Sequence, residues 1–164
     1  MCNKKLYLVF LCSIILLFAT DSFSFSSDEE MSQNYEMLEV TGEAVKWQVF
    51  AKTEEIEKCT EDSEGFDECY IEPIYSEEIK NLNNKNIIIT GYMFPLDPSE
   101  KQQNFLIGPY PTSCPFHYHA GPSKIIEVKL KKHINFSYDP VTVKGILSLD
   151  YNKESGVFYY LRQN

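Results

Sequence analysis

The sequence lacks the short motifs that mark the common enzyme classes. It contains no Gly-x-Ser-x-Gly, no paired-cysteine redox motif, no glycine-rich phosphate loop and no His-Glu-x-x-His. Each of these motifs places a nucleophile, a redox thiol pair, phosphate-binding amides or a pair of zinc ligands where the chemistry needs them. Their absence favours a binding protein over an enzyme.

Positive charge is also scarce. The chain has 15 Lys and Arg against 24 Asp and Glu, a net charge of −9, and no stretch in which basic residues gather. A protein of this sign repels nucleic acid and anionic lipid, which both require a basic surface. We therefore expect neither as a partner.

Only one long hydrophobic run is present. Residues 6–19 are apolar apart from Ser13, and they follow Lys4 and Lys5. This layout predicts a cleavable signal peptide over residues 1–26, with cleavage near Ser24 or Ser26. An uncleaved anchor is the alternative, but the run is shorter than the roughly 20 residues that span a bilayer. We expect a periplasmic or secreted protein without stable membrane insertion after cleavage.

The remaining chain has the length of one domain. We expect a flexible N-terminal segment over residues 27–43 and a single β domain over residues 44–164. Removal of the signal leaves a net charge of about −10.

Three of the five cysteines lie beyond the predicted signal peptide. Cys59 and Cys69 bracket an acidic segment with Gly65 at its centre, and disulfides persist in exported proteins. We predict a Cys59–Cys69 disulfide that closes an acidic loop, with two reduced thiols as the alternative. Cys114 is then left without a partner.

The domain contains almost no convincing amphipathic helix. Short stretches of β-type residues alternate with turns, which predicts an all-β fold: a small barrel or sandwich of about seven short strands, OB-fold-like, with at most one short helix. Ser76 is the expected cap of that helix. Gly91 predicts a bulge or a tight bend. The expected strands cover residues 45–49, 71–75, 87–94, 104–107, 125–130, 141–149 and 157–161.

A proline-rich loop over residues 108–122 holds the residues with the greatest chemical potential. Cys114, His117 and His119 fall within six residues of one another. Thiolate and imidazole are preferred ligands of Zn(II) and Cu, so these three residues form a candidate metal site. A fourth ligand could come from Met93, Glu127 or water, and the isolated His133 is expected at the surface.

Two other interpretations of this loop remain open. Cys114 can serve as a small buried apolar residue beside two surface histidines. It can also act as a reactive thiol with His117 as base, although an activated cysteine needs positive charge nearby and only Lys124 lies close in sequence.

Several segments together resemble a known family. Its most specific part is a strand end of the form Gly-x-x-x-Pro-Leu at Gly91, followed by a Cys-Pro-Phe loop at Cys114. The other matching segments are Trp47 and residues 82–96, 105–107, 113–116, 121–122 and 141–145.

These segments resemble exported bacterial proteins of domain-of-unknown-function family 3299. The resemblance implies an envelope protein with a small β-barrel-like domain and no established activity. Some relatives carry a second cysteine where this chain has His117, an exchange of one soft ligand for another that fits a metal site. The Cys59–Cys69 segment departs from the family pattern.

Three functional hypotheses follow. The first is a non-enzymatic exported protein that binds Zn or Cu through the Cys-x-x-His-x-His loop. The second is a β-barrel interaction module that binds an envelope protein or a peptide. The third is a thiol-dependent enzyme.

Overall fold

The computed structural model describes residues 36–61, 63–111 and 120–163 of the chain. All of them belong to the unit Gln33–Asn164, and the other unit, Met1–Ser32, lies outside this part. The predicted signal peptide over residues 1–26 therefore also lies outside it. Among the described residues, no helix is both long enough and apolar enough to cross a bilayer.

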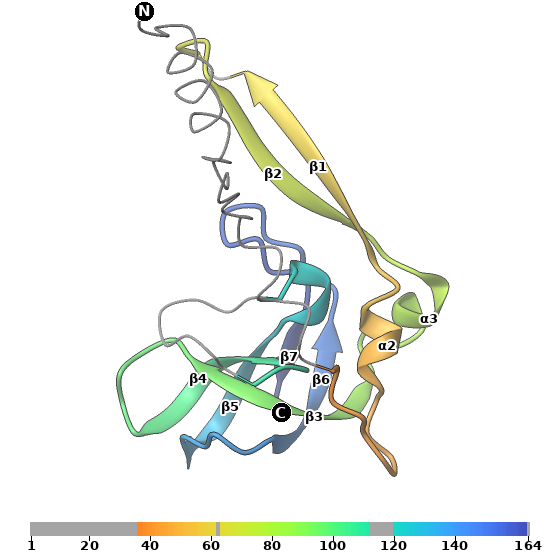
Figure 1. Cartoon of the computed structure of the whole chain (residues 1–164), viewed down its shortest axis with the longest axis vertical. Helices are drawn as coiled ribbons and strands as arrows, with labels where there is room; N and C mark the ends of the chain where they lie inside the picture. Colours follow the sequence, from red (N-terminus) through yellow and green to blue (C-terminus); the bar gives the residue numbers. More distant parts are fainter. Residues whose placement is uncertain (1–35, 62, 112–119, 164) are drawn as a thin grey trace, which may run out of the picture. The chain divides into compact units, whose positions relative to one another are not determined.

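Five strands close into a barrel in the order β3-β4-β5-β7-β6, with β3 paired to β6 (Figure 1). Strands β5 and β7 run parallel, and the other neighbours run antiparallel. The prediction of an all-β, OB-fold-like small barrel is confirmed. The strands are β3 (Asn86–Pro95), β4 (Lys101–Gly108), β5 (Ile126–Asn135), β6 (Val141–Ser148) and β7 (Tyr160–Arg162).

Alternating apolar residues build the interior of the barrel. Along β3, Ile87, Ile89 and Met93 are buried, while the intervening side chains are half-buried. This is the period of two that a strand requires to place one row of side chains in a core. The same core includes Phe105, Ile107, Ile126, Val128, Leu130, Val143, Leu147, Phe158, Tyr159 and Leu161.

Gly91 lies where β3 changes partner. Residues 86–91 of β3 pair with β6, and residues 92–95 pair with β4. A Cβ atom at Gly91 would lie 2.6 Å from the carbonyl oxygen of Gly108 and 2.8 Å from the Trp47 ring. Glycine is therefore required by close approach of its neighbours at the position where β3 changes partner.

The first predicted strand, over residues 45–49, is wrong. Its centre instead forms a four-residue helix, α2 (Trp47–Phe50). Trp47 and Phe50 are both fully buried, and a spacing of three places them on one side of a helical turn. Trp47 also donates from Nε1 to the carbonyl oxygen of Thr90 at 2.7 Å. Tertiary packing of two aromatic rings overrides the local alternation.

A second short helix, α3 (Glu77–Lys80), begins where the sequence predicted one. The Ser76 hydroxyl accepts a hydrogen bond from the Ile79 amide, and Glu77 and Glu78 occupy the first turn. Both features stabilise a helix N-terminus. The described residues thus hold two short α-helices where at most one was expected, and a 3₁₀ turn, η2 (Pro122–Lys124).

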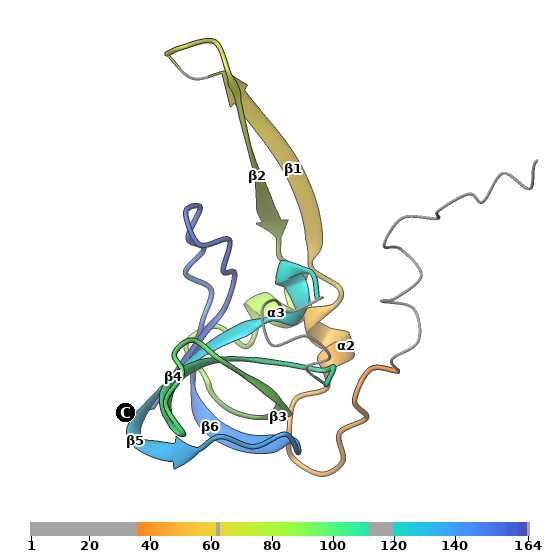
Figure 2. The same ribbon diagram turned by 60° about the vertical axis from the view of Figure 1, so that its left-hand side comes forward.

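The acidic segment between the two cysteines forms the tip of a hairpin. The hairpin consists of two antiparallel strands, β1 (Glu54–Glu61) and β2 (Asp67–Ile74), which pair only with each other. Both views show this hairpin extending away from the barrel (Figure 1 and Figure 2). Every described side chain of β1 is exposed. The described residues therefore contain seven strands, the predicted number, with β1 in place of residues 45–49.

Candidate functional site

The predicted metal ligands Cys114, His117 and His119 lie outside the described residues, which omit positions 112–119. Both ends of the loop that carries them are described. Strand β4 ends at Gly108, η2 begins at Pro122, and Ile107 pairs directly with Ile126 across β4 and β5. The loop therefore leaves one barrel strand and returns to its immediate neighbour.

Hydrogen bonds fix the backbone on each side of this loop. On the β4 side, the Leu38 amide donates to the Pro109 carbonyl at 3.1 Å. On the β5 side, the buried Ser123 amide donates to Glu55 Oε1 at 2.9 Å. A Cβ atom at Gly121 would lie 2.6 Å from the same carboxylate oxygen, so glycine leaves room for it.

The proposed fourth ligands lie in different environments. Met93 is 1% exposed and belongs to the barrel core. Glu127 is half-buried on β5, where its backbone lies between Leu106 and Tyr160 of the two neighbouring strands. His133 is exposed on the same strand, as predicted.

The predicted disulfide is present between Cys59 and Cys69, with an S–S distance of 2.03 Å. These cysteines occupy directly paired positions of β1 and β2. Together with Glu57 they form the only group of three metal-ligating residue types found among the described residues. Because both sulfurs are bonded to each other, this group offers no thiolate and does not form a metal centre.

The hairpin presents two chemically different faces. Directly paired residues of an antiparallel ladder project to the same side, and successive pairs alternate. One face, here called the acidic face, carries Glu55, Glu57, Cys59, Glu61, Asp67, Cys69, Ile71 and Pro73. The other, here called the lysine face, carries Glu54, Ile56, Lys58, Thr60, Glu68, Tyr70, Glu72 and Ile74.

Cations pair with two of the three carboxylates of the lysine face. Lys58 forms an ion pair with Glu72 at 2.7 Å, which raises the pKa of the Lys58 ammonium. Lys153, from the turn between β6 and β7, lies 3.5 Å from Glu68 and 3.9 Å from the centre of the Tyr70 ring. The carboxylates of the acidic face form no ion pair with a described residue, and among them only that of Glu55 accepts a hydrogen bond from the described part of the chain, from the Ser123 amide.

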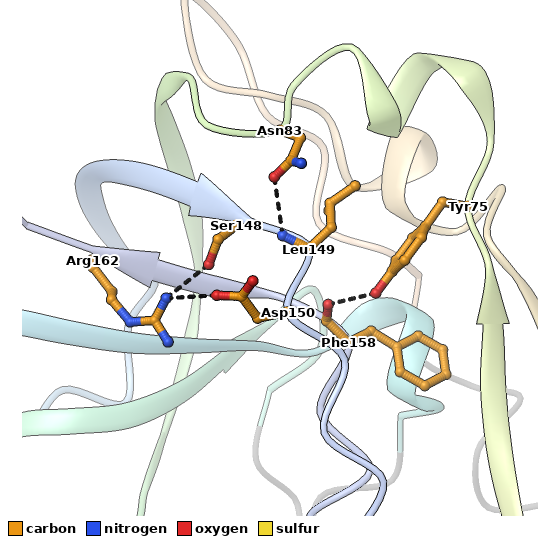
Figure 3. Close-up of polar contacts among 7 residues, drawn as sticks. All are labelled: Tyr75, Asn83, Ser148, Leu149, Asp150, Phe158 and Arg162. Carbon is orange, nitrogen blue, oxygen red and sulfur yellow. Dashed lines mark hydrogen bonds and ion pairs between the residues drawn. The ribbon is translucent and has the colours of Figure 1, made fainter.

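The base of the β6–β7 turn is tied to the end of the hairpin. Tyr75, directly after β2, donates from its hydroxyl to the Phe158 carbonyl at 2.9 Å (Figure 3). Arg162 donates to Ser148 Oγ at 2.8 Å and to Asp150 Oδ2 at 3.1 Å. The hydrogen bond from Arg162 lowers the pKa of the Asp150 carboxyl. The contacts hold the turn that carries Lys153 toward the lysine face.

Sequence reasoning found the disulfide and missed the hairpin. The signal that could have revealed the hairpin was the spacing of the two cysteines. If the residues on either side of them form two antiparallel strands, a bond between Cys59 and Cys69 sets the register and so fixes every other pair of the ladder. The polar composition of residues 54–61 concealed the strand, since alternation of apolar residues is visible only where one face is buried.

Comparison with known proteins places the chain in a family. A model of the family described as "Protein of unknown function (DUF3299)" matches residues 25–161. A crystal structure of a DUF3299 family protein from Pseudomonas aeruginosa PAO1 is similar at 22% identity and a TM-score of 0.45. The match covers 56% of this chain and 62% of that chain, less than two thirds of its length. A search of curated proteins found no match. The chain belongs to the DUF3299 family of proteins of unknown function.

Proposed function

We propose that this protein is an exported, non-enzymatic binding protein that holds a transition metal, Zn(II) or Cu, through Cys114, His117 and His119. The observation that supports the proposal is the fixed exit and return of the loop. Ile107 and Ile126 pair across neighbouring strands, and hydrogen bonds hold Pro109 and Ser123. Anchored ends and four prolines reduce the conformational entropy that the loop loses when a metal binds.

The chemistry of the three side chains gives the site a defined pH dependence. A thiolate and two neutral imidazoles bind metal only when deprotonated, so protons compete with the metal. We expect affinity to fall steeply as pH drops through the histidine range, about 6 to 6.5.

Titration calorimetry of the demetallated mature protein with Zn(II) and with Cu tests the proposal. We expect Cys114→Ser to weaken binding far more than His133→Ala, which removes an exposed histidine from β5 and serves as the control. Elemental analysis of protein purified from its native compartment identifies the metal. Millimolar affinity, or equal affinity of wild type and the Cys114 variant, would reject the metal site.

A second candidate function is supported by the hairpin. A protein that needed only a stable barrel would gain little from sixteen mostly exposed strand residues that form a separate two-stranded sheet. An exposed, covalently closed hairpin suits an interaction module that binds an envelope protein or a peptide. A photoreactive residue on the hairpin is expected to form a discrete adduct in cells, while the same residue at Lys144 on the barrel exterior is not.

A thiol-dependent enzyme is the third hypothesis, and a pH titration separates it from the other two. Alkylation of Cys114 by a thiol reagent is measured against pH on metal-free protein. Reaction that begins only above about pH 8, the unperturbed thiol range, would eliminate this hypothesis. Rapid reaction near pH 6 would favour it over simple metal binding.

A further inference from the structure

We propose that the acidic face of the β1–β2 hairpin docks on a partner protein through a Lys- and Arg-rich surface of that partner. The inference rests on the interaction-module function above and specifies both the face that binds and the chemistry that it recognises.

The first observation is how strongly charge is concentrated in the hairpin. Residues 54–74 contain nine Asp and Glu and one Lys, a net charge of −8, while the whole chain carries −9. The remainder of the chain is therefore almost neutral at −1. A concentrated field of one sign on an exposed element speeds and orients the approach of a partner of opposite sign.

The second observation is that two of the three carboxylates of the lysine face have a paired cation, whereas none of those on the acidic face has one among the described residues. Lys58 and Lys153 contact carboxylates of the lysine face. Glu57, Glu61 and Asp67 on the acidic face have no ion pair with any residue in the described ranges. A basic surface can therefore approach the acidic face without displacing an internal cation.

The third observation is that the carboxylates of the acidic face repel one another and so destabilise the hairpin. Glu61 and Asp67 are directly paired across the strands, and like charges in that position are destabilising. Glu55 and Glu57 lie two residues apart on the same face, about 7 Å along the strand and within the screening length of about 8 Å at physiological salt. The adjacent disulfide holds the two strands together against the repulsion between the carboxylates of the ladder.

Apolar groups lie beside the carboxylates on the same face. Ile71 is 37% exposed and pairs directly with Glu57, and Pro73 pairs with Glu55. The acidic face thus offers a row of carboxylates from β1 next to a row of apolar surface from β2. Lys and Arg fit this combination because they carry a charged head on an aliphatic stem.

Other ligands fit less well. The Cys59 and Cys69 sulfurs are joined in a disulfide, so the adjacent Glu57 lacks thiolate partners for a metal. Nucleic acid and anionic lipid have the wrong sign. A second copy of the chain offers exposed Lys131 and Lys132 on β5, and self-association is therefore measured as a separate outcome.

Two charge-matched variants of the mature, disulfide-bonded chain test the proposal. E57Q/E61Q/D67N removes three charges from the acidic face, and E54Q/E68Q/E72Q removes three from the lysine face. Glu55 stays unchanged in both because it holds the Ser123 amide. The probe is a fluorescent peptide of alternating Lys and Ile, and binding is followed by anisotropy at increasing NaCl.

We expect the acidic-face variant to bind the peptide about tenfold more weakly than wild type, and the lysine-face variant to stay within about twofold. Equal weakening would show that only net charge matters and would overturn the proposal. Absence of peptide binding by the wild type would also overturn the proposal. The charges would then have the role of preventing the exposed strand edges from pairing with other chains. Self-association without peptide binding would assign the face to a second copy and would equally overturn it.

Photo-crosslinking in cells that produce the protein natively separates this proposal from the function on which it rests. The photoreactive residue replaces Glu57 on the acidic face or Glu54 on the lysine face. Adducts from position 57 only, lost in the E61Q/D67N background, support the proposal. Adducts from position 54 only would keep the interaction module and reject the acidic face. Adducts from neither position would reject both.

Discussion

The barrel and the hairpin are stabilised in opposite ways. The barrel encloses a core in which Trp47, Phe105 and Tyr159 are fully buried. The hairpin buries almost nothing and depends on its backbone ladder and on the Cys59–Cys69 bond. A two-stranded hairpin alone is marginally stable in water. The disulfide bond thus supplies to the hairpin the stability that the barrel obtains from its hydrophobic core.

The two regions also differ in charge. Almost all of the net charge lies on the hairpin, and the rest of the chain is nearly neutral. The barrel can therefore pack closely without strong self-repulsion, while the hairpin carries the electrostatic field. We therefore expect substitutions on the hairpin surface to change the electrostatic field with little effect on the stability of the barrel.

Removal of the Trp47 side chain should have the largest effect on the barrel. Trp47→Ala leaves a cavity in the core and deletes the hydrogen bond to Thr90, so we expect a loss of about 3–5 kcal/mol in the free energy of unfolding. Denaturant unfolding measures this loss. Ile74→Ala on the hairpin, where the side chain is 54% exposed, is the control and should change stability by less than about 0.5 kcal/mol. Similar losses in both variants would show that the barrel and the hairpin do not differ in how they are stabilised.

Removal of the disulfide should affect the hairpin alone. With a sequence separation of 10 residues, the loop-entropy relation gives a local loss of about 3 kcal/mol for C59S/C69S, equivalent to about 100-fold faster amide exchange in β1 and β2. Exchange in β3 and β5 and the denaturant midpoint of the barrel should stay nearly unchanged. Global unfolding of the variant would show that the hairpin supports the barrel after all.

The close approach at Gly91 predicts a moderate loss in the barrel. In Gly91→Ala the new methyl group would meet the Gly108 carbonyl, the Trp47 ring and Ile107 at less than 3 Å, so the barrel wall must shift. Overpacking of this kind costs about 1–3 kcal/mol. Lys144→Ala, on an exposed position of β6, is the matched control and should be neutral. If Gly91→Ala left the free energy of unfolding unchanged, position 91 would have more space than these distances indicate.

Buried tyrosines should make the barrel sensitive to alkaline pH. Burial raises the pKa of Tyr75 to about 12 and also raises that of Tyr159, which donates to Thr53 Oγ1 at 2.6 Å. Since the folded pKa values exceed the unfolded value near 10, their stabilisation is complete below pH 10 and is lost as pH rises toward 12.

Tyr159→Phe tests this pH dependence and should have the smallest effect of the series. We expect a loss of about 1 kcal/mol at pH 7, because the buried Thr53 hydroxyl loses its donor. The variant should also lose less stability than wild type between pH 10 and 12 in urea unfolding. An unchanged alkaline profile would show that Tyr159 does not contribute to it.

The sequence predicted the barrel strands well because each has one face in the core. Along β6, Val143 and Leu147 are buried, while Thr142 and Lys144 face outward, so apolar alternation and strand structure coincide. The same rule failed at α2. Residues 45–49 show the alternation of a strand. The rings of Trp47 and Phe50 nevertheless contact each other and are both buried because a helical turn places them on the same side. The conformation of that segment therefore depends on packing and hydrogen bonding with residues distant in sequence, such as Thr90.

The candidate sites were predictable to different degrees. The Cys59–Cys69 bond was predictable from the spacing of the two cysteines and from the expected compartment. The two faces of the hairpin did not, because charge balance there depends on Lys153, about 80 residues further along the chain. The metal loop with Cys114, His117 and His119 stays a prediction, supported by its residue types and its anchored ends.

The distances along the chain between paired residues imply an order of assembly. In the hairpin, Glu54 pairs with Ile74, 20 residues away, whereas closure of the barrel pairs Asn86 with Ile146, 60 residues away. Local pairing is fast, on the order of microseconds for a hairpin, while long-range pairing must first overcome the entropy of a larger loop. We therefore expect Cys59 and Cys69 to meet before the barrel closes. Oxidation of this pair then does not require a folded barrel.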